Sequence, residues 1–432
     1  MSLQALLFLL VYSIALVYAV IAKPIFGLYA YILNFFLDPP GRWWGSYLPD
    51  LRWSFLAAGA TLAAILINRR NPHAPKPLSF LAFKLYVLYV LWMWVQSGWV
   101  VDPEEHARGL NFMTKFVLVI YMVTVLAGSI QIIERILFAM VAGGFYLGYL
   151  AFSSYTGGRL DGIGGPGIND ASSLGLVMAA FAIVAGVLYH IGEGPGKWLS
   201  AMALPFILNA IVAASSRASF LALAAGGIVL FLYRPPRETA RLLFYGLLAM
   251  SLFLSLASEF FWERMQTMRA ATDESGEMDK SAASRFVIVE SQWKIFLDHP
   301  LGAGHHGTAA LSYKYIPIEY HASQGGRASH NTVMTVLVDQ GIVGILLWIA
   351  LLITIYQMCR RNHEIAIRVG DKRVAWINSS IAAALAAIFV GGLFSQQLKL
   401  EVFYWFMALE MALSHCVART YEPMHDRQIR AD

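Results

Sequence analysis

Three side chains in this chain of 432 residues have the chemistry that a phosphate-linked substrate needs. Arg217 and Arg285 carry guanidinium groups, whose forked N–H donors match the oxygens of a phosphate. Histidine titrates near neutral pH, so His330 can take a proton from an attacking hydroxyl group. Together these residues predict a site that holds a diphosphate and activates a nucleophile.

Each of the three also has a purely structural explanation. Arg217 stands where an apolar run begins, and a lone arginine there often anchors a helix at the membrane interface. Arg285 can equally be a solvated residue or a contact for lipid headgroups. His330 can close a helix end without any chemistry. The functional hypothesis therefore depends on the elements that would bring the three together.

Polar residues mark the starts of three predicted helices. Ser216, Asn169 and Asn331 lie at or next to those starts, and their residue types suit the N-cap position. The unpaired N–H groups and positive dipole of a helix N-terminus suit a phosphate. If the three helices begin on the same side of a membrane, this arrangement suits attack by an acceptor hydroxyl on a sugar carried by a lipid diphosphate. The three helices are predicted at 171–190, 217–233 and 331–358.

The composition predicts an all-α, polytopic integral membrane protein. Of the residues 58% are hydrophobic and only 14% are charged, and mean hydropathy is +0.57. A soluble protein would carry roughly a quarter charged residues. The net charge of +5 is explained by lysines and arginines that anchor the protein at the cytoplasmic surface of the membrane. It does not indicate that the protein binds nucleic acid. Apolar runs occur at 2–22, 24–38, 51–68, 80–100, 110–128, 131–153, 171–190, 197–214, 217–233, 239–257, 331–358, 375–394 and 400–417.

The first two runs are separated only by Lys23 and Pro24. Because proline bends or ends helices and 24–38 is short, the pair is predicted to be one bent element or a re-entrant hairpin. About twelve crossings are therefore expected. Cys359 and Cys416 fall at the predicted inner ends of helices, which argues against a structural disulfide.

The distribution of basic residues predicts the orientation. The loops at 69–78, 234–241 and 359–373 are rich in lysine and arginine and are therefore predicted to be cytoplasmic. Parity then places the long hydrophilic loop outside. The chain divides into membrane helices in 1–258, an outer loop subdomain in 259–330, and membrane helices with a cytoplasmic tail in 331–432.

Within the outer loop, residues 285–297 predict an amphipathic helix. Phe286, Val289, Trp293 and Phe296 share one face of it. The polar stretch 270–283 is expected to be mobile. Histidines in this loop are too unevenly spaced to predict a metal site, and no metal is expected. They are His305, His306 and His321.

The chain resembles the O-antigen ligase/polymerase superfamily in a succession of short motifs. In order, these are Arg285, Trp293, Phe296, the block His299-Pro300-Leu301-Gly302-Ala303-Gly304, Ser329-His330-Asn331, Gly341 and Gly344. The placement of Arg217 behind two serines and the glycine-rich turn around Asn169 also look like the family's layout.

The resemblance implies a C-type glycosyltransferase-like domain in the bacterial inner membrane, with its active site facing the periplasm. It implies that a glycan moves from undecaprenyl diphosphate to the lipid A–core in lipopolysaccharide biosynthesis, without a metal or other cofactor. Arg217 and Arg285 would bind the lipid-linked diphosphate, and His330 would act as base or position the acceptor. Asn169, Asn331 and Ser216 are secondary candidates.

Three alternatives stay open. The same signature is shared by O-antigen polymerases and by protein O-oligosaccharyltransferases, so it does not fix the acceptor. A lipid-linked glycan flippase is the alternative outside the enzymes. A transporter is expected to place ionisable residues near the bilayer midplane and often has inverted repeats. Here Glu410 is the clearest residue of that kind, and no repeat is visible.

Overall fold

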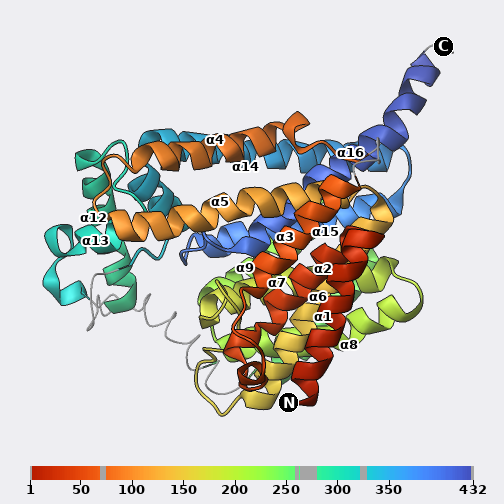
Figure 1. The fold of residues 1–432 in the computed structure, drawn as a ribbon, viewed down its shortest axis with the longest axis horizontal. Coiled ribbons are helices and arrows are strands. Elements are labelled where there is room, and N and C mark those ends of the chain that lie inside the picture. The colour runs from red at the N-terminus through yellow and green to blue at the C-terminus, as the bar shows by residue number, and fades with distance from the viewer. Residues whose placement is uncertain (1, 69–73, 258–261, 263–279, 322–327, 430–432) are drawn as a thin grey trace.

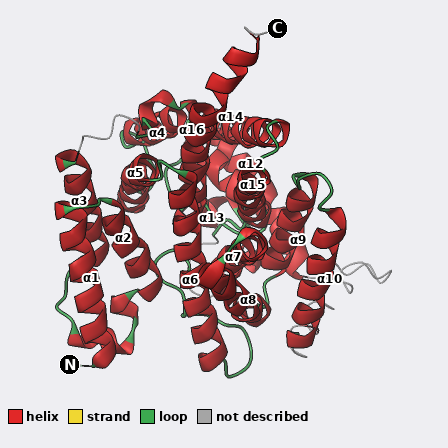
Figure 2. Cartoon of the chain, turned by 90° about the vertical axis from the view of Figure 1, so that its right-hand side faces the viewer, coloured by secondary structure: helices red, strands yellow, loops and turns green. Residues whose placement is uncertain are grey.

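The computed structural model describes residues 2–68, 74–257, 262, 280–321 and 328–429, and the side chains of these residues except in 280–285 and 422–429. All regular elements in these ranges are helical (Figures 1 and 2). The α-helices are α1 (Leu3–Ile21), α2 (Ile25–Leu37), α3 (Trp53–Ile67), α4 (Leu81–Gln96), α5 (Pro103–Leu126), α6 (Ile130–Ser154), α7 (Ala171–Ile191), α8 (Gly194–Ala214), α9 (Arg217–Leu232), α10 (Thr239–Leu256), α12 (Lys280–Asp298), α13 (Gly307–Tyr315), α14 (Thr332–Arg368), α15 (Lys372–Gly392) and α16 (Glu401–Ile429). Short 3-10 helices are η1 (Pro39–Gly41), η2 (Trp43–Tyr47), η3 (Pro77–Ser79) and η4 (Ile318–Tyr320).

Membrane-spanning helices dominate the described part of the chain. Eight helices there are long and apolar enough to cross a membrane, and α3, α4 and α9 are shorter apolar helices. The prediction of an all-α, multi-pass membrane protein is therefore confirmed. All thirteen predicted apolar runs correspond to helices.

The first two apolar runs form a hairpin and not a single bent helix. Phe8, near the start of α1, packs against Trp53 at the start of α3, with ring centroids 5.3 Å apart. Val20, near the end of α1, accepts a hydrogen bond from Asn68, which follows α3. Helices α1 and α3 therefore run in the same direction, and α2 returns between them. With 13 residues, α2 is short for a 30 Å hydrocarbon core.

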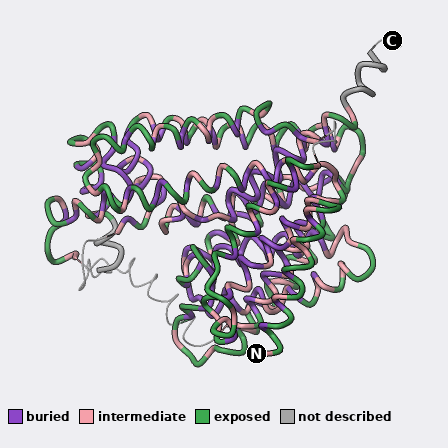
Figure 3. Tube along the Cα trace, in the orientation of Figure 1, coloured by how far each residue is buried: buried purple, intermediate pink, exposed green. Residues whose placement is uncertain are grey.

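Helix α7 is the centre of the bundle. In the most apolar stretch of α7, 89% of the residues are buried, whereas in that of α1 only 22% are buried (Figure 3). Small residues on α7 allow the neighbouring helices to approach closely. Such close packing matters in a membrane, because there is no hydrophobic driving force that holds helices together there. A methyl group on Gly175 of α7 would lie 2.2 Å from the hydroxyl of Ser219 on α9. This contact leaves the first turns of α7 and α9 side by side.

A cluster of ion pairs marks one end of the bundle, which we call the basic end. Glu238, between α9 and α10, accepts from Lys372 at 3.0 Å and from Arg241 at 2.9 Å. Arg373 donates to both carboxylate oxygens of Glu134 at 2.6 and 3.0 Å. These contacts tie the starts of α6 and α15 together. The opposite end, where α7, α9 and α14 begin, we call the site end.

Helices α4, α5 and α14 extend side by side to a small layer that contains α12 and α13 (Figure 1). Helix α14 is interrupted at Gly341, whose φ of 65° and ψ of −165° lie outside the helical region. Glycine adopts positive φ without the steric cost that other residues meet. Nine residues of α14, from Thr332 to Gln340, therefore form a separate first segment.

Candidate active site

Arg217 is positioned by a sharp corner between α8 and α9. Ser215 ends α8 in a left-handed conformation with φ 45°, and its buried hydroxyl donates to the carbonyl of Val212 at 3.0 Å. Ser216 is the N-cap of α9 and Arg217 is its first residue. The predicted helix start is therefore confirmed. The Ser216 side chain makes no cap hydrogen bond to this first turn, and a helix start carries the positive end of the helix dipole.

The start of α7 lies beside that of α9 but differs in its capping. The Ser216 hydroxyl is 3.4 Å from that of Ser172 on α7. A carboxylate oxygen of Asp170 accepts from the N–H groups of Ser172 and Ser173, both at 3.0 Å. Asp161 accepts from the N–H of the first residue of α7 at 2.7 Å. Since two carboxylates occupy this N-terminus, α9 is better suited to an anion than α7.

Asn169 belongs to the turn that precedes α7. With its amide oriented so that nitrogen faces the two carbonyls, it donates to Gly164 at 3.0 Å and to Gly162 at 3.3 Å. Gly162 has a φ of +82°, which this turn requires. The geometry therefore gives Asn169 a structural part in holding the glycine-rich turn closed.

Asn331 caps the third helix start, as its residue type predicts. Its side-chain oxygen accepts from the N–H of Met334 at 3.1 Å. The preceding His330 is exposed, whereas Ser329 is buried. The imidazole of His330 therefore stands at the surface of the site end, on a backbone that is anchored on both sides.

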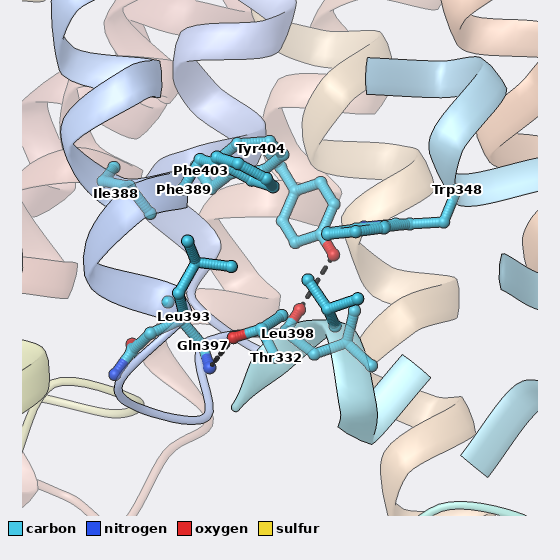
Figure 4. Close-up of a pocket in the computed structure, with 11 residues that line it drawn as sticks. Thr332, Trp348, Ile388, Phe389, Leu393, Gln397, Leu398, Phe403 and Tyr404 are labelled. Atoms are coloured by element: carbon cyan, nitrogen blue, oxygen red, sulfur yellow. Dashed lines mark hydrogen bonds between the residues drawn. The ribbon is translucent and has the colours of Figure 1, made fainter. Parts of the chain in front are cut away.

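The turn between α15 and α16 joins α7 to α14. Its residue Gln397 is buried, and the side-chain Nε2 donates to Ser173 on α7 at 3.0 Å. The backbone N–H of Gln397 donates to the hydroxyl of Thr332 at 2.9 Å (Figure 4). Thr332 in turn donates to the carbonyl of Ser395 at 2.9 Å. Through this turn, the helix starts that follow Asn169, Ser216 and His330 are linked in one hydrogen-bonded series.

A hollow lies beside this junction, between α14, α15 and α16 (Figure 4). The space there that is not filled by atoms is about 370 Å³ when the open solvent at its mouth is counted. Trp348, Phe389 and Phe403 supply much of an apolar lining, while Thr332 and Gln397 form its polar edge. The polar edge is the same pair that connects the helix starts.

The block His299 to Gly304 docks onto the kink of α14. The N–H groups of Ala303 and Gly304 donate to the carbonyls of Val338 and Asp339 at 2.9 and 3.0 Å, and that of Ile342 donates to Pro300 at 2.9 Å. Hydrogen bonds of this kind are available because Gly341 leaves the helical conformation. A methyl group on Gly341 would lie 2.3 Å from the carbonyl carbon of Leu301.

His305 and His306 follow this block, and the structure gives both a structural setting. Asp339 accepts from the N–H of His306 at 3.2 Å and from that of Gly307 at 3.0 Å, which caps α13. The ring of His305 is buried and packs on that of His106, with centroids 5.3 Å apart. Burial, together with the charge of Lys399, lowers the pKa of His305 well below its usual value. In the described ranges, no group of three or more histidine, cysteine or acidic residues is arranged to hold a metal ion.

Arg285 lies on α12, within the predicted amphipathic helix, but its side chain is outside the described part of the structure. Its contacts with the other candidates therefore stay a prediction. What the structure adds is the position of its helix, which packs against α13 and α14.

The comparison with known families bears on this same region. Residues 200–349 match the model of the O-antigen ligase family. The chain carries an O-antigen ligase domain. The matched region begins in α8, contains Arg217, Arg285 and His330, and ends just beyond the kink of α14. Proteins of the O-antigen ligase family are membrane glycosyltransferase-like enzymes, and the match over residues 200–349 supports membership of the O-antigen ligase/polymerase superfamily. No curated protein matches the chain.

Sequence reasoning missed several residues that build this O-antigen ligase domain's site. Gln397, Gln292 and Asp339 are not singled out in the sequence analysis. Their partners lie far along the chain, so no local pattern marks them. A buried polar residue in an apolar run, as Asp339 is in α14, is the one signal that was available.

Proposed function

We propose that this protein is an O-antigen ligase of the bacterial inner membrane. It moves a glycan from undecaprenyl diphosphate to the lipid A–core, at a site that faces the periplasm. The observation that supports this proposal most is the series of hydrogen bonds that links the three helix starts. Ser216 contacts Ser172, and the neighbouring Ser173 accepts from Gln397, whose backbone N–H donates to Thr332. This series gathers Arg217 and the His330 segment at one end of the bundle, inside the region that matches the family.

The diphosphate of the donor binds between the first turn of α9 and the loop layer. Arg217 and Arg285 bind its oxygens, and the positive end of α9 adds to their charge. The carboxylates that cap α7 keep the anion from that helix start. The negative charge on the diphosphate grows as the glycosidic bond breaks, so these groups stabilise the transition state more than the bound donor.

The reaction is a displacement at the anomeric carbon. A hydroxyl oxygen of the acceptor sugar forms the new bond to that carbon, and the bond to the diphosphate oxygen breaks. The leaving group is undecaprenyl diphosphate. His330 receives the proton of the hydroxyl, an effect worth roughly 10²–10⁴-fold in rate. No metal or nucleotide is required, since the diphosphate already activates the sugar.

The acceptor of the glycan distinguishes the proposed ligase from the two other kinds of enzyme in the superfamily. A polymerase would extend one lipid-linked glycan with another, and a protein O-oligosaccharyltransferase would modify a pilin-like protein. The flippase alternative is less well supported. Glu410, which lies in the middle of an apolar run in the sequence, accepts a hydrogen bond from Asn362 at 2.6 Å within a buried contact of α14 and α16, as a packing residue does.

The proposal is tested with purified protein in lipid vesicles, undecaprenyl-diphosphate-linked glycan as donor, and three separate acceptors. We expect transfer to lipid A–core, none to a pilin-like protein, and no elongation of the donor alone. The expected activity survives EDTA, is lost in Arg217→Ala and Arg285→Ala, and falls roughly 10²–10⁴-fold in His330→Ala. Elongation of the donor in place of ligation would reassign the protein as a polymerase.

A further inference from the structure

A fully buried glutamine lies in the layer that contains α12 and α13. Gln292 is on α12 and has 0% exposure. Its carbonyl oxygen Oε1 has no hydrogen-bond partner among the described residues, so the side chain is held through its nitrogen. A buried amide costs free energy unless its hydrogen bonds are made. A residue kept there in spite of this cost calls for an explanation.

The amide nitrogen of Gln292 joins three segments. Its Nε2 donates to the hydroxyl of Thr308 on α13 at 3.1 Å. The same atom donates to the hydroxyl of Ser329 at 2.8 Å. Both acceptors are themselves buried, with 3% exposure each. Gln292 thereby connects α12 to the residue immediately before His330.

The Ser329 hydroxyl uses its whole hydrogen-bonding capacity around His330. It donates to the carbonyl of Asn331 at 3.0 Å and accepts from the N–H of Asn331 at 3.2 Å. Together with the bond from Gln292, this accounts for its one donor and two acceptor sites. The backbone of His330 is therefore held between Ser329 and the N-cap of α14.

Gln292 also has a fixed relation to Arg285 on the same helix. They are seven residues apart, which is close to two full turns of an α-helix, so they fall on one stripe about 10 Å apart along the axis. The helix that carries Arg285 is thus tied, through one side chain, to the segment that carries His330.

We propose that Gln292 is a positioning residue that fixes His330 relative to α12. This rests on the proposed function of His330 as the base. Because Gln292 acts on the placement of the imidazole, its loss lowers kcat and leaves donor affinity unchanged. A misplacement of about 1 Å can cost on the order of 100-fold in rate.

Two substitutions remove this tie from opposite sides, and a third is the matched control. Gln292→Met keeps the size of the side chain without its amide, and Ser329→Ala removes the acceptor. Thr308→Val removes the other acceptor of the same nitrogen, at equal burial, and leaves the bond to Ser329. We expect kcat to fall at least tenfold in the first two and less than twofold in the third. Affinity for undecaprenyl diphosphate should change less than twofold in all three.

Combination with His330→Ala separates positioning from a general loss of structure. If Gln292 acts through His330, then Gln292→Met has little further effect on the residual rate of His330→Ala. An equal fold-loss in both backgrounds would overturn the inference, as would an equal loss of kcat in Thr308→Val and Gln292→Met. Full activity of His330→Ala would instead overturn the assignment of His330 as the base. The single variants of Gln292 cannot give that result, so the two failures are distinguishable.

Discussion

At the scale of single residues, the three helix starts at the site end are not equivalent. All begin with polar residues of the types that cap helices, which the sequence makes evident. Asp161 and Asp170 neutralise the start of α7, and Asn331 caps α14, whereas α9 begins with Ser216 and a cation. The negative charge of a diphosphate is best placed at α9, which makes Arg217 the residue whose removal should weaken donor binding most directly.

Arg217→Ala should weaken binding of undecaprenyl diphosphate by roughly 10- to 100-fold. A hydrogen bond to a charged group is worth about 1.5–3 kcal/mol, and about 1.4 kcal/mol corresponds to tenfold. Arg217→Lys should recover part of the loss, because it restores the charge without the fork. The measurement is binding of the lipid to purified protein in detergent.

The matched control is Arg108→Ala on α5. Arg108 is 59% exposed and pairs only with Glu104 and Glu105 in the described structure, and exposed pairs of this kind contribute little. A similar loss of affinity in both variants would remove Arg217 from the binding site.

His305 should make the stability of the protein depend on pH. Its pKa is lowered by burial in the folded chain, whereas in the unfolded chain it titrates near pH 6.5. Below that pH the unfolded state binds more protons, so the free energy of unfolding decreases as the pH falls. The contribution of the neutral His305 ring to the free energy of unfolding is fully present above about pH 6.5. His305→Gln should flatten the decline of Tm between about pH 7 and pH 5, measured in detergent. An unchanged slope would contradict the neutral, buried state of this ring.

At the scale of elements, the apolar runs predict the helices well because each is long and its neighbours are polar. Boundaries differ most clearly in α5, in α14 and in α16, which ends at Ile429 and not at 417. Helix α5 begins at Pro103 and not at 110, although Asp102 before a proline and two glutamates is a local start signal. Helix α14 continues to Arg368, because the basic segment after the membrane run stays helical, supported by Arg360 and Glu364.

The contacts that build the site were beyond sequence reasoning for a physical reason. Gln397 meets Ser173, and Gln292 meets Ser329, across separations of 224 and 37 residues. Periodicity reports which face of a helix is apolar and says nothing about which polar groups meet across the fold. The kink at Gly341 was likewise not predictable, since it depends on the docking of Leu301 and Gly302.

Gly341→Ala should disrupt this docking. The new methyl group would meet the backbone of Leu301 and Gly302 at 2.3–2.4 Å, and the positive φ is unfavourable for alanine. We expect a loss of at least about 2 kcal/mol of stability, from the conformational strain and overpacking together. The measurement is thermal unfolding in detergent, accompanied by the ligation assay.

Gly186→Ala on α7 is the control, because no atom lies within 4 Å of its new methyl group. It should be neutral or slightly stabilising, as alanine is favoured over glycine in helices. Equal stability of the two variants would show that the block from Pro300 to Gly304 does not depend on the kink.

At the scale of the whole molecule, the ion pairs of Glu134 and Glu238 lie at one end of the bundle, and Arg217 and His330 lie at the other. We propose that the basic end faces the cytoplasm and that the division into 1–258, 259–330 and 331–432 separates membrane helices from a periplasmic loop. The loop and the last part are nevertheless joined by the backbone bonds at Gly341 and by Gln292.

Cysteine labelling tests the orientation. Ser46→Cys near the site end should react with a membrane-impermeant maleimide that reaches the periplasm of intact cells. Val369→Cys, 44% exposed at the basic end, should react only after the inner membrane is opened. Cys359 and Cys416 are free but buried, so the background is low. The reverse pattern of labelling would place the candidate site in the cytoplasm.

The interruption of α14 has a mechanical consequence. At 1.5 Å per residue, the 37 residues of α14 reach about 55 Å, well beyond a hydrocarbon core of about 30 Å. The part after Gly341 is long enough to cross the membrane by itself, so the first nine residues form a separate segment with the backbone of His330 at its end. A segment of roughly 14 Å that swings by about 10° moves its end by about 2 Å. Catalytic groups must be held to within about 0.5 Å, so the position of His330 depends on the backbone bonds of Pro300, Ala303 and Gly304 that restrain this segment, as well as on the bond from Gln292 to Ser329.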